Sequence, residues 1–396
     1  MVIEIKGASF VNKGAQLMLK ALITKRELFN DDSIFVMHMR SGSFSERNSY
    51  RMGHLAWLHT WNYLPAATLT DTFFSFFPRK LRKKYNIWLK NEVKWVLDIS
   101  GFIYSDDFGS KPSSRMADYY RQLRKAGARI IIMPQAMGPF EKPNVRESVL
   151  KIIDAAELIF IRDDVSFGHI TDLAGHLEKI IYAPDFTLSL KGMEKEKYIG
   201  LKDRVCIIPN EKLFKSHTID KNKYIGLINS IILFCSKKKV RPFLLLHEYN
   251  KDSFLLESLK GRIDISLDII SESDPLVLKG IIGSSKLVIS SRYHGLINAL
   301  YQSVPVIATG WTHKYEALMN EYGLGDYMIS DYDPRSIRNM MTGLFDAIIS
   351  DTITKRISLE NERREKRLNE MWKRITTVTV SYTHLRAHET LRYRGF

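Results

Sequence analysis

One pattern recurs along the chain: a short apolar run, a turn with glycine or polar residues, and then a helical pattern. In the clearest copy, the run Leu287–Ile289 ends in two serines and leads at once into a helical pattern that reaches Leu300. Strands that alternate with helices favour a parallel sheet covered by helices. The pattern therefore predicts an α/β fold built from βα units.

The length of the chain indicates more than one such sheet. At 396 residues it exceeds the size that one hydrophobic core usually reaches, and we expect two Rossmann-like domains. The first should cover 1–195 and the second 204–333, because the stretch between them is rich in Lys and Glu. A polar helical segment over 334–377 should finish the second domain or cross back to the first.

The last stretch, 378–396, differs in character from what precedes it. It resembles a translated sequencing-adapter sequence, and we expect it to be a non-native tail, with a genuine short tail as the alternative. His384 and His388 are therefore left out of the site predictions.

The charge balance points to an acidic partner. Lys and Arg number 59 against 44 Asp and Glu, a net charge of +15. Such an excess suits a phosphorylated substrate, a nucleic acid or an anionic membrane. No nucleic-acid-binding module is recognisable, so we expect no nucleic-acid partner. The two cysteines, Cys206 and Cys235, lie in apolar runs without metal-ligand spacing, which predicts a reducing, cytoplasmic setting and no metal. We also expect no cofactor.

A membrane role could come only from the surface of the protein. Glu4 and Lys6 interrupt any signal-peptide core, and no apolar run approaches the roughly 20 residues that span a bilayer. Residues 70–85 hold four Phe followed by five basic residues. This stretch would suit peripheral contact with the inner face of a membrane, or it packs on the domain with a solvated basic turn.

Several turns of the first domain hold candidate binding residues. The glycines of the loop 7–14 are seven apart, so the dinucleotide fingerprint is absent and Asn12 is better suited to shape a site for a polar substrate. Asp106 caps a turn or accepts hydrogen bonds from sugar hydroxyls. Gln135 follows a buried strand, where open α/β sheets place ligands. Arg162 pairs with Asp163 or binds an anion.

The second domain offers a candidate anion site. Arg292 and His294 fall on the strand-to-helix turn, where backbone amides favour an anion, and Gly295 allows a close approach of the backbone. The alternative is a solvated Arg with a capping His. Lys314, in the next βα loop, could reach the same anion or remain solvated.

Two further residues of this domain follow a predicted strand. His247 and Glu248 could orient or deprotonate an acceptor hydroxyl, whereas a structural histidine is the other interpretation.

An ordered set of short motifs supports a family resemblance. The set comprises Asn12-Lys-Gly14, Asp98-x-x-Gly101 with Ser105-Asp106, Pro134-Gln-x-x-Gly-Pro139, Arg162-Asp-x-x-Ser166, Pro184-Asp185, Pro209-Asn210, His247-Glu248, Ser291-Arg-Tyr-His-Gly295, and Lys314 before Gly323-Leu324. In this order, over residues 1 to about 330, the chain resembles the polysaccharide pyruvyl transferases. The loop Asp98–Gly101 has less glycine than in many members.

The resemblance implies a GT-B-like enzyme with two Rossmann-like domains facing across a cleft, the first on the acceptor side and the second binding the donor. Such an enzyme moves pyruvate from phosphoenolpyruvate onto a sugar diol as a cyclic ketal and releases phosphate. The acceptor would be a sugar or a lipid-linked oligosaccharide of a capsule or exopolysaccharide. By the same likeness, Arg162, Arg292 and His294 match positions of donor binding and catalysis.

The chemistry of the donor suits these residues. Phosphoenolpyruvate carries a carboxylate and a phosphate, for which two guanidinium groups and a helix N-terminus are matched partners. His294 is the candidate acid that protonates the enol carbon, or it only hydrogen-bonds the phosphate. We expect it to be neutral without donor and protonated with it. A GT-B glycosyltransferase that uses a nucleotide sugar is the alternative function.

Overall fold

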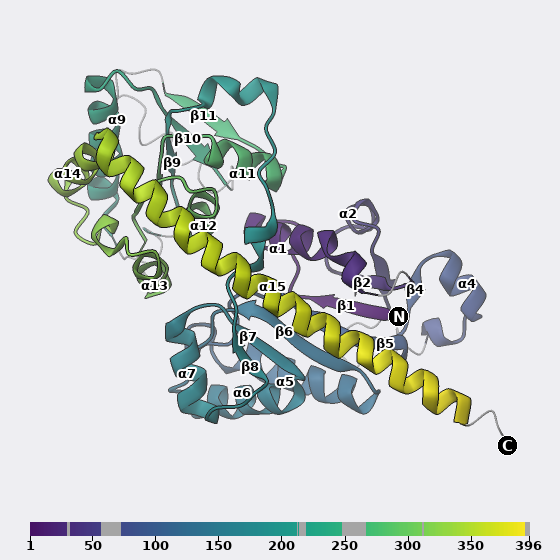
Figure 1. Cartoon of the computed structure of the whole chain (residues 1–396). Helices are drawn as coiled ribbons and strands as arrows, with labels where there is room; N and C mark the ends of the chain where they lie inside the picture. Colours follow the sequence, from purple (N-terminus) through teal and green to yellow (C-terminus); the bar gives the residue numbers. More distant parts are fainter. Residues whose placement is uncertain are drawn as a thin grey trace. The chain divides into compact units, whose positions relative to one another are not determined.

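The computed structural model describes residues 1–29, 32–56, 73–211, 213, 219–247, 267–310 and 313–392, with side chains up to 379. The chain forms two compact units (Figure 1). Unit 1 comprises Met1–Thr187 and Lys366–Phe396, and unit 2 comprises Leu188–Glu365. Unit 2 thus begins before residue 195, the end expected for the first domain.

Unit 1 is built on a parallel sheet that has eight strands in the described residues, in the order β4-β3-β2-β1-β5-β6-β7-β8. The strands are β1 (Val2–Lys6), β2 (Ile34–His38), β3 (Gly53–Leu55), β4 (Ile87–Trp88), β5 (Val93–Asp98), β6 (Arg129–Gln135), β7 (Leu158–Ile161) and β8 (Ile180–Tyr182). Because β1 pairs with both β2 and β5, the strand order reverses there, as in a doubly wound fold. The prediction of a parallel first domain is confirmed.

Helices connect these strands, and one face of the sheet is covered by α5 and α6. The helices of unit 1 are α1 (Lys13–Thr24), α2 (Phe44–Ser49), α4 (Arg79–Lys84), α5 (Ser110–Lys125), α6 (Pro143–Ala155) and α7 (Asp164–Ala174). Val96 and Ile130 of the sheet pack with Tyr120 and Leu123 of α5 in one buried cluster. Burial of such side chains stabilises each by about 1.5–3 kcal/mol.

Unit 2 repeats the arrangement on a smaller scale. Its described sheet has five parallel strands in the order β11-β10-β9-β12-β13. They are β9 (Val205–Ile208), β10 (Pro242–Leu246), β11 (Asp268–Ser271), β12 (Leu287–Ser290) and β13 (Val306–Ala308), with helices α9 (Lys221–Lys237), α11 (Pro275–Gly283), α12 (Tyr293–Leu300), α13 (His313–Glu321) and α14 (Pro334–Phe345). Its strand order reverses between β9 and β12.

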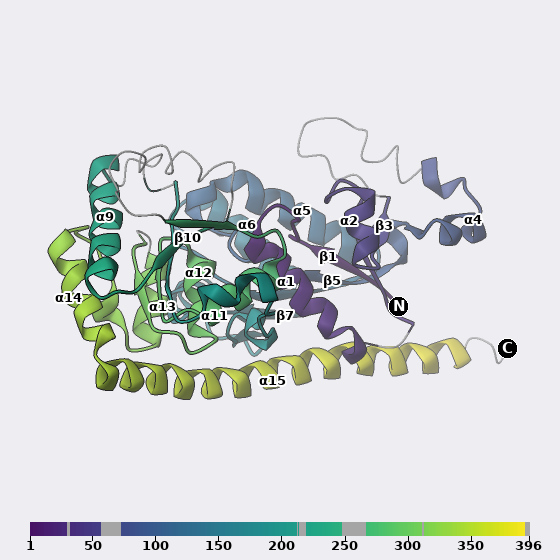
Figure 2. The same ribbon diagram turned by 90° about the horizontal axis from the view of Figure 1, so that it is seen from above.

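The C-terminal helical segment is two helices. Asp346 has an extended backbone that ends α14, and its carboxylate accepts hydrogen bonds from the amides of Ile348 and Ile349 at the start of α15 (Ala347–Arg392). Figure 2 shows α15 without a break. Its residues up to Glu365 belong to unit 2 and those from Lys366 to unit 1, so the expected segment 334–377 is divided between the units.

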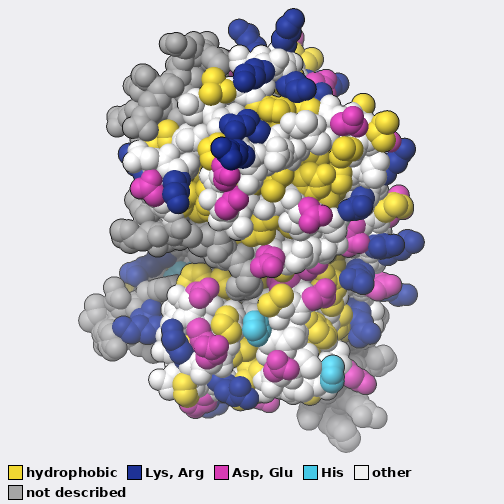
Figure 3. Space-filling model, turned by 90° about the vertical axis from the view of Figure 1, so that its left-hand side faces the viewer, with side chains coloured by type: hydrophobic (Ala, Val, Ile, Leu, Met, Phe, Trp, Pro, Cys, Tyr) yellow, Lys and Arg dark blue, Asp and Glu magenta, His cyan; other side chains and the backbone are white. Residues whose placement is uncertain are grey.

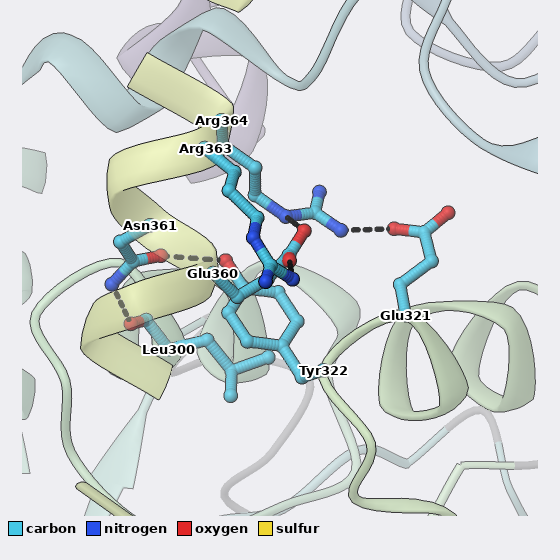
Figure 4. Close-up of polar contacts among 7 residues, drawn as sticks. All are labelled: Leu300, Glu321, Tyr322, Glu360, Asn361, Arg363 and Arg364. Carbon is cyan, nitrogen blue, oxygen red and sulfur yellow. Dashed lines mark hydrogen bonds and ion pairs between the residues drawn. The ribbon is translucent and has the colours of Figure 1, made fainter. Parts of the chain in front are cut away.

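Buried polar contacts attach the first half of α15 to unit 2 (Figure 4). The Nη2 of Arg364 lies 2.5 Å from a carboxylate oxygen of Glu321. Asn361 donates to the backbone oxygen of Leu300 at 2.7 Å and accepts from the hydroxyl of Tyr322 at 2.7 Å. Leu300 is the last residue of α12, so α15 satisfies a carbonyl at the C-terminal end of that helix.

The second half of α15 packs within unit 1. Trp372 and Phe186 form an edge-to-face pair with centroids 6.1 Å apart. The guanidinium of Arg367 lies 4.9 Å from the ring of Tyr182, at the end of β8. These contacts place the helix beside the last strand of the unit 1 sheet.

On the face seen in Figure 3, Lys and Arg lie among Asp and Glu, so that face carries mixed charge.

Cys206 and Cys235 are both buried, as predicted, and burial raises the pKa of both thiols. No helix in the described part of the chain combines the length and apolar character needed to cross a bilayer. The described side chains include no cluster of three or more His, Cys, Asp or Glu arranged to hold a metal ion.

Candidate functional site

The first candidate site lies where the strand order of unit 2 reverses. Neighbouring strands β9 and β12 end at Ile208 and Ser290, and the turns that follow them lie at the same edge of the sheet. Open α/β sheets bind ligands at this edge, at the point of reversal. Residues 209–210 and 291–295 are therefore placed where a ligand is expected.

Ser291 is held from several sides. Its backbone oxygen accepts hydrogen bonds from the hydroxyl of Tyr315 at 3.0 Å and from Nδ2 of Asn210 at 3.2 Å. Its hydroxyl lies 2.6 Å from the hydroxyls of both Tyr224 and Thr309. Burial raises the pKa of Tyr315, so its hydroxyl remains a proton donor. The start of the turn is thus held by residues from four other segments of unit 2.

Arg292 follows as the N-cap residue of α12. Its Nε donates to the backbone oxygen of Pro209 at 3.0 Å, and its amide donates to the hydroxyl of Ser290 at 3.0 Å. The half-buried guanidinium is therefore oriented by the turn after β9. Pro209 thus orients Arg292, and Asn210 holds Ser291. Both residues of the turn after β9 therefore have a structural role in the turn after β12.

Aromatic rings surround the other polar side chains of this turn. The ring of Tyr293 packs edge-to-face with those of His294 and Tyr315, with centroids 5.8 and 5.7 Å away. The Nζ of Lys314 lies 5.3 Å from the ring of Tyr293, within cation–π range. Arg292, His294 and Lys314 thus cluster around one helix N-terminus, whose amides also favour an anion.

Gly295 allows α12 to approach the sheet. A Cβ at this position would lie 2.5 Å from the hydroxyl of Ser290 and 3.0 Å from Ile208. Only glycine leaves room for this contact with the sheet.

His247 follows β10 and is buried, and β10 neighbours β9 on the side away from β12. Glu248 lies outside the described residues.

Arg162 lies at the carboxyl end of the unit 1 sheet, directly after β7. Its Nη1 is 3.4 Å from a carboxylate oxygen of Asp185, and both side chains are almost fully buried. The other oxygen of Asp185 accepts from the amide and the hydroxyl of Thr187. Asp163, the ion-pair partner considered from the sequence, is instead the N-cap of α7 and accepts from the amide of Ser166 at 2.8 Å.

Gln135 ends β6 beside Arg162, and its backbone oxygen accepts from the amide of Arg162 at 3.3 Å. Its side chain is fully buried. Neither Oε1 nor Nε2 has a hydrogen-bond partner among the described residues. Buried amides in proteins normally have partners, so Gln135 is a candidate ligand residue on physical grounds.

Two other predicted residues make structural contacts. The side-chain oxygen of Asn12 caps α1 by accepting from the amides of Gly14 and Ala15. The carboxylate of Asp106 accepts from the amide of Glu141 at 2.6 Å and from that of Lys142 at 3.3 Å. Asp106 therefore joins its own loop to the loop after β6.

A cavity of about 490 Å³ opens at the reversal point of the unit 1 sheet, between the turns that follow β1 and β5. Its lining includes Lys6, His38, Ser100, Phe102, Phe108 and Arg115. Asn12, Asp106 and Gln135 are not among the described residues that line this cavity. None of these lining residues was predicted from the sequence, although Lys6 at the end of the first strand was a usable signal.

The sequence of the chain matches a known family. Residues 12–313 match the family model described as polysaccharide pyruvyl transferase. The chain belongs to the polysaccharide pyruvyl transferase family. The matched region begins at Asn12 and includes every predicted site residue of this family member except Lys314. It ends one residue before Lys314.

Solved structures resemble this polysaccharide pyruvyl transferase family member in fold. HepE from Anabaena in complex with UDP has a TM-score of 0.58 at 11% identity, covering 95% of this chain and 99% of that one. The UDP-GlcNAc 2-epimerase from Neisseria meningitidis, bound to UDP-GlcNAc, has a TM-score of 0.56 at 12% identity, covering 91% and 95%. S. aureus MnaA with UDP has a TM-score of 0.55 at 12% identity, covering 90% of each chain. The fold is therefore that of GT-B enzymes, with two Rossmann-like units.

Proposed function

We propose that the protein transfers a pyruvyl group from phosphoenolpyruvate to a sugar diol of a cell-surface polysaccharide or its precursor, forming a ketal and releasing phosphate. Family membership supports a transferase of this class. The observation that carries the donor assignment is the turn at Arg292, which gathers cationic groups at the N-terminus of α12. Such a turn suits a ligand with a phosphate and a carboxylate.

The reaction requires a proton at the methylene carbon of the donor and two attacks at its central carbon. Protonation and attack by the first sugar hydroxyl give a phosphorylated intermediate with a new methyl group. Phosphate leaves with the C–O bonding pair, and the second hydroxyl attacks the resulting oxocarbenium centre. Of the two hydroxyl protons, one balances the proton added to carbon and the other leaves with phosphate.

We assign roles to the residues of the turn by their chemistry. Arg292 binds the phosphate or the carboxylate, with its plane oriented by Pro209. Lys314 contributes a second positive charge, and His294 supplies the proton or hydrogen-bonds the phosphate. Gly295 is needed for the packing of α12 on the sheet, so its role is to position the turn.

In unit 1, we propose Arg162 as an anion ligand whose guanidinium is oriented by Asp185. Gln135 and His247 remain proposed acceptor ligands, since Gln135 ends one strand and His247 follows another, each at the carboxyl end of its sheet.

The test compares two products. The purified protein is incubated with phosphoenolpyruvate and a panel of glycan diols, and phosphate and ketal are measured, the ketal by its methyl signal in NMR. In parallel, UDP-glucose and UDP-GlcNAc replace phosphoenolpyruvate and UDP release is measured. Acceptor-dependent phosphate with ketal supports the proposal. Acceptor-dependent UDP release alone would instead support nucleotide-sugar transfer, which the ligands of HepE and the epimerase make the second candidate.

We also propose that the surface around α4 contacts an anionic membrane. Phe73 and Phe76 are 57% and 81% exposed, beside a helix on which most of the basic side chains face solvent. These exposed basic residues are Arg79, Lys80, Lys83 and Lys84. Aromatic side chains with flanking cations bind at lipid interfaces, with about 1 kcal/mol from each cation near anionic lipid.

Vesicle sedimentation tests this surface. Binding to vesicles with phosphatidylglycerol should exceed binding to pure phosphatidylcholine and should weaken with salt. The double variant Phe73→Ala/Phe76→Ala should lose most of this binding, whereas Ile199→Ala, at a side chain 73% exposed elsewhere, should not. Equal binding by both variants would show that this surface is not the contact.

A further inference from the structure

The cavity of unit 1 has a distinct chemical composition. Its ionisable lining residues are Lys6 at the end of β1, His38 at the end of β2 and Arg115 on α5. No Asp or Glu is among the described residues that line it. Two permanent cations and one titratable ring in a cavity without carboxylates favour an anionic ligand.

Strand register brings two of these groups together. β1 and β2 pair in parallel with Glu4 opposite Val36, and Lys6 and His38 each lie two residues further along. Residues two apart on a strand point to the same face, so both side chains emerge on one side of the sheet. The Nζ of Lys6 lies 4.3 Å from the ring of Tyr119 on α5, the helix that also carries Arg115.

The histidine is oriented by its neighbour. The Nδ1 of His38 accepts a hydrogen bond from the amide of Arg40 at 3.2 Å. In the neutral ring the proton is therefore on Nε2, which makes that nitrogen a hydrogen-bond donor. His38 thus complements the two cations as a donor to an oxyanion.

The lining also has an aromatic part. Phe102 and Phe108 form an edge-to-face pair with centroids 5.4 Å apart, and Phe108 is half exposed. Apolar ring faces beside a few polar groups are common in sites for small molecules. A volume of about 490 Å³ is sufficient for a sugar with a charged substituent.

We propose that this cavity is an acceptor subsite that recognises an anionic group on the glycan, a phosphate or a carboxylate. This inference rests on the proposed function in treating the bound sugar as the acceptor. The binding of an anionic sugar can be measured independently of that function. Arg115 and Lys6 bind the anion, and the phenylalanine pair contacts the sugar ring.

Binding is measured by titration calorimetry without phosphoenolpyruvate. The probes are glucose 1-phosphate, glucuronic acid and glucose. We expect at least one of the two anionic sugars to bind about tenfold or more tightly than glucose, and which one does so identifies the anion. Equal affinity for all three probes, or no binding by any, would overturn the proposal.

Variants locate the binding. Arg115→Gln should reduce the affinity for the anionic sugar about tenfold. Arg121→Gln is the matched control, because Arg121 lies on the same helix, exposed, and pairs with Asp118. Lys6→Gln provides a second test, with the melting temperature recorded for each variant. Affinity unchanged in both Arg115→Gln and Lys6→Gln would place the anion elsewhere.

The outcome is separable from that of the proposed function. If phosphate release from phosphoenolpyruvate fails but Arg115-dependent binding persists, the cavity inference stands and the donor is wrong. If phosphate release succeeds equally well with neutral and anionic acceptors, and Arg115→Gln does not alter KM for the acceptor, the cavity inference falls while the function stands.

Discussion

The guanidinium of Arg292 donates from Nε to the backbone oxygen of Pro209 at 3.0 Å, which connects the turns after two neighbouring strands. A planar guanidinium anchored at Nε has a defined orientation. An ammonium at the same place has no such plane. This relationship makes the identity of the cation, and not only its charge, testable.

Arg292→Lys should therefore lower kcat/KM for phosphoenolpyruvate about 100-fold, which corresponds to about 2.7 kcal/mol of transition-state stabilisation. The loss should be measured by phosphate release with a saturating acceptor. Arg338→Lys, at an exposed arginine of α14, is the control and should retain full activity. Full activity of Arg292→Lys would remove Arg292 from the proposed donor site.

Tyr315 and Asn210 both donate to the backbone oxygen of Ser291, so their contributions should be coupled. Tyr315→Phe and Asn210→Ala should each cost about 1 kcal/mol in the free energy of unfolding. The double variant leaves that buried oxygen without either donor and should cost about 1 kcal/mol more than the sum. Urea unfolding of the four proteins measures the coupling, and strict additivity would contradict it.

Gly7 has a φ of +81°, and a Cβ there would lie 2.5 Å from the Cα and amide nitrogen of Ser100. Gly109 has a φ of +69° but open space around it. Gly109→Ala should therefore cost only the backbone strain, about 1–2 kcal/mol, whereas Gly7→Ala should cost about 2 kcal/mol more. Thermal unfolding of the two variants compares them, and equal losses would mean that the contact with Ser100 relaxes.

Glu272 links stability to pH in unit 2. Burial of its carboxylate raises the pKa, but hydrogen bonds from the Asp274 amide, the Tyr198 hydroxyl and Lys197, with the charge of Lys195, outweigh burial and lower it to about 2. Because the folded pKa lies below the ordinary 4.5, this stabilisation is present above about pH 4.5 and lost as the pH falls toward 2.

Glu272→Gln should consequently cost about 2 kcal/mol at pH 7, allowing for solvent screening of the exposed lysines. The difference from wild type should shrink between pH 4.5 and 3, as followed by urea unfolding. Glu147→Gln, at an exposed carboxylate, should leave the unfolding midpoint unchanged. A difference for Glu272→Gln that stays constant down to pH 3 would contradict the shifted pKa.

Local pattern was sufficient for the turn at Arg292. The predicted junction is confirmed, since β12 ends at Ser290 and α12 begins at Tyr293. An apolar run that changes to a helical period within a few residues leaves little choice of where a strand ends. By contrast, β3 and β4 have only three and two residues, too few for a recognisable period, and neither was predicted from the sequence.

Partners distant in sequence were less predictable. Arg162 pairs with Asp185 and not with the adjacent Asp163, because Asp163 caps the helix that begins beside it. Asp106 binds backbone amides 35 and 36 residues later, so the sequence could not distinguish this loop contact from a sugar ligand. Such pairings depend on how loops meet at the edge of a sheet.

The sequence by itself determined the parallel α/β class, the two Rossmann-like units and the cationic turn from Arg292 to Gly295, because hydrophobic periodicity and residue chemistry are local properties. Only the tertiary structure decided which turns are neighbours. Pairing of β1 with β5 brings Gly7 beside Ser100, and pairing of β9 with β12 brings Pro209 beside Arg292. Strand order is set by packing across the whole sheet, and that order places Lys6 and Arg115 around one cavity.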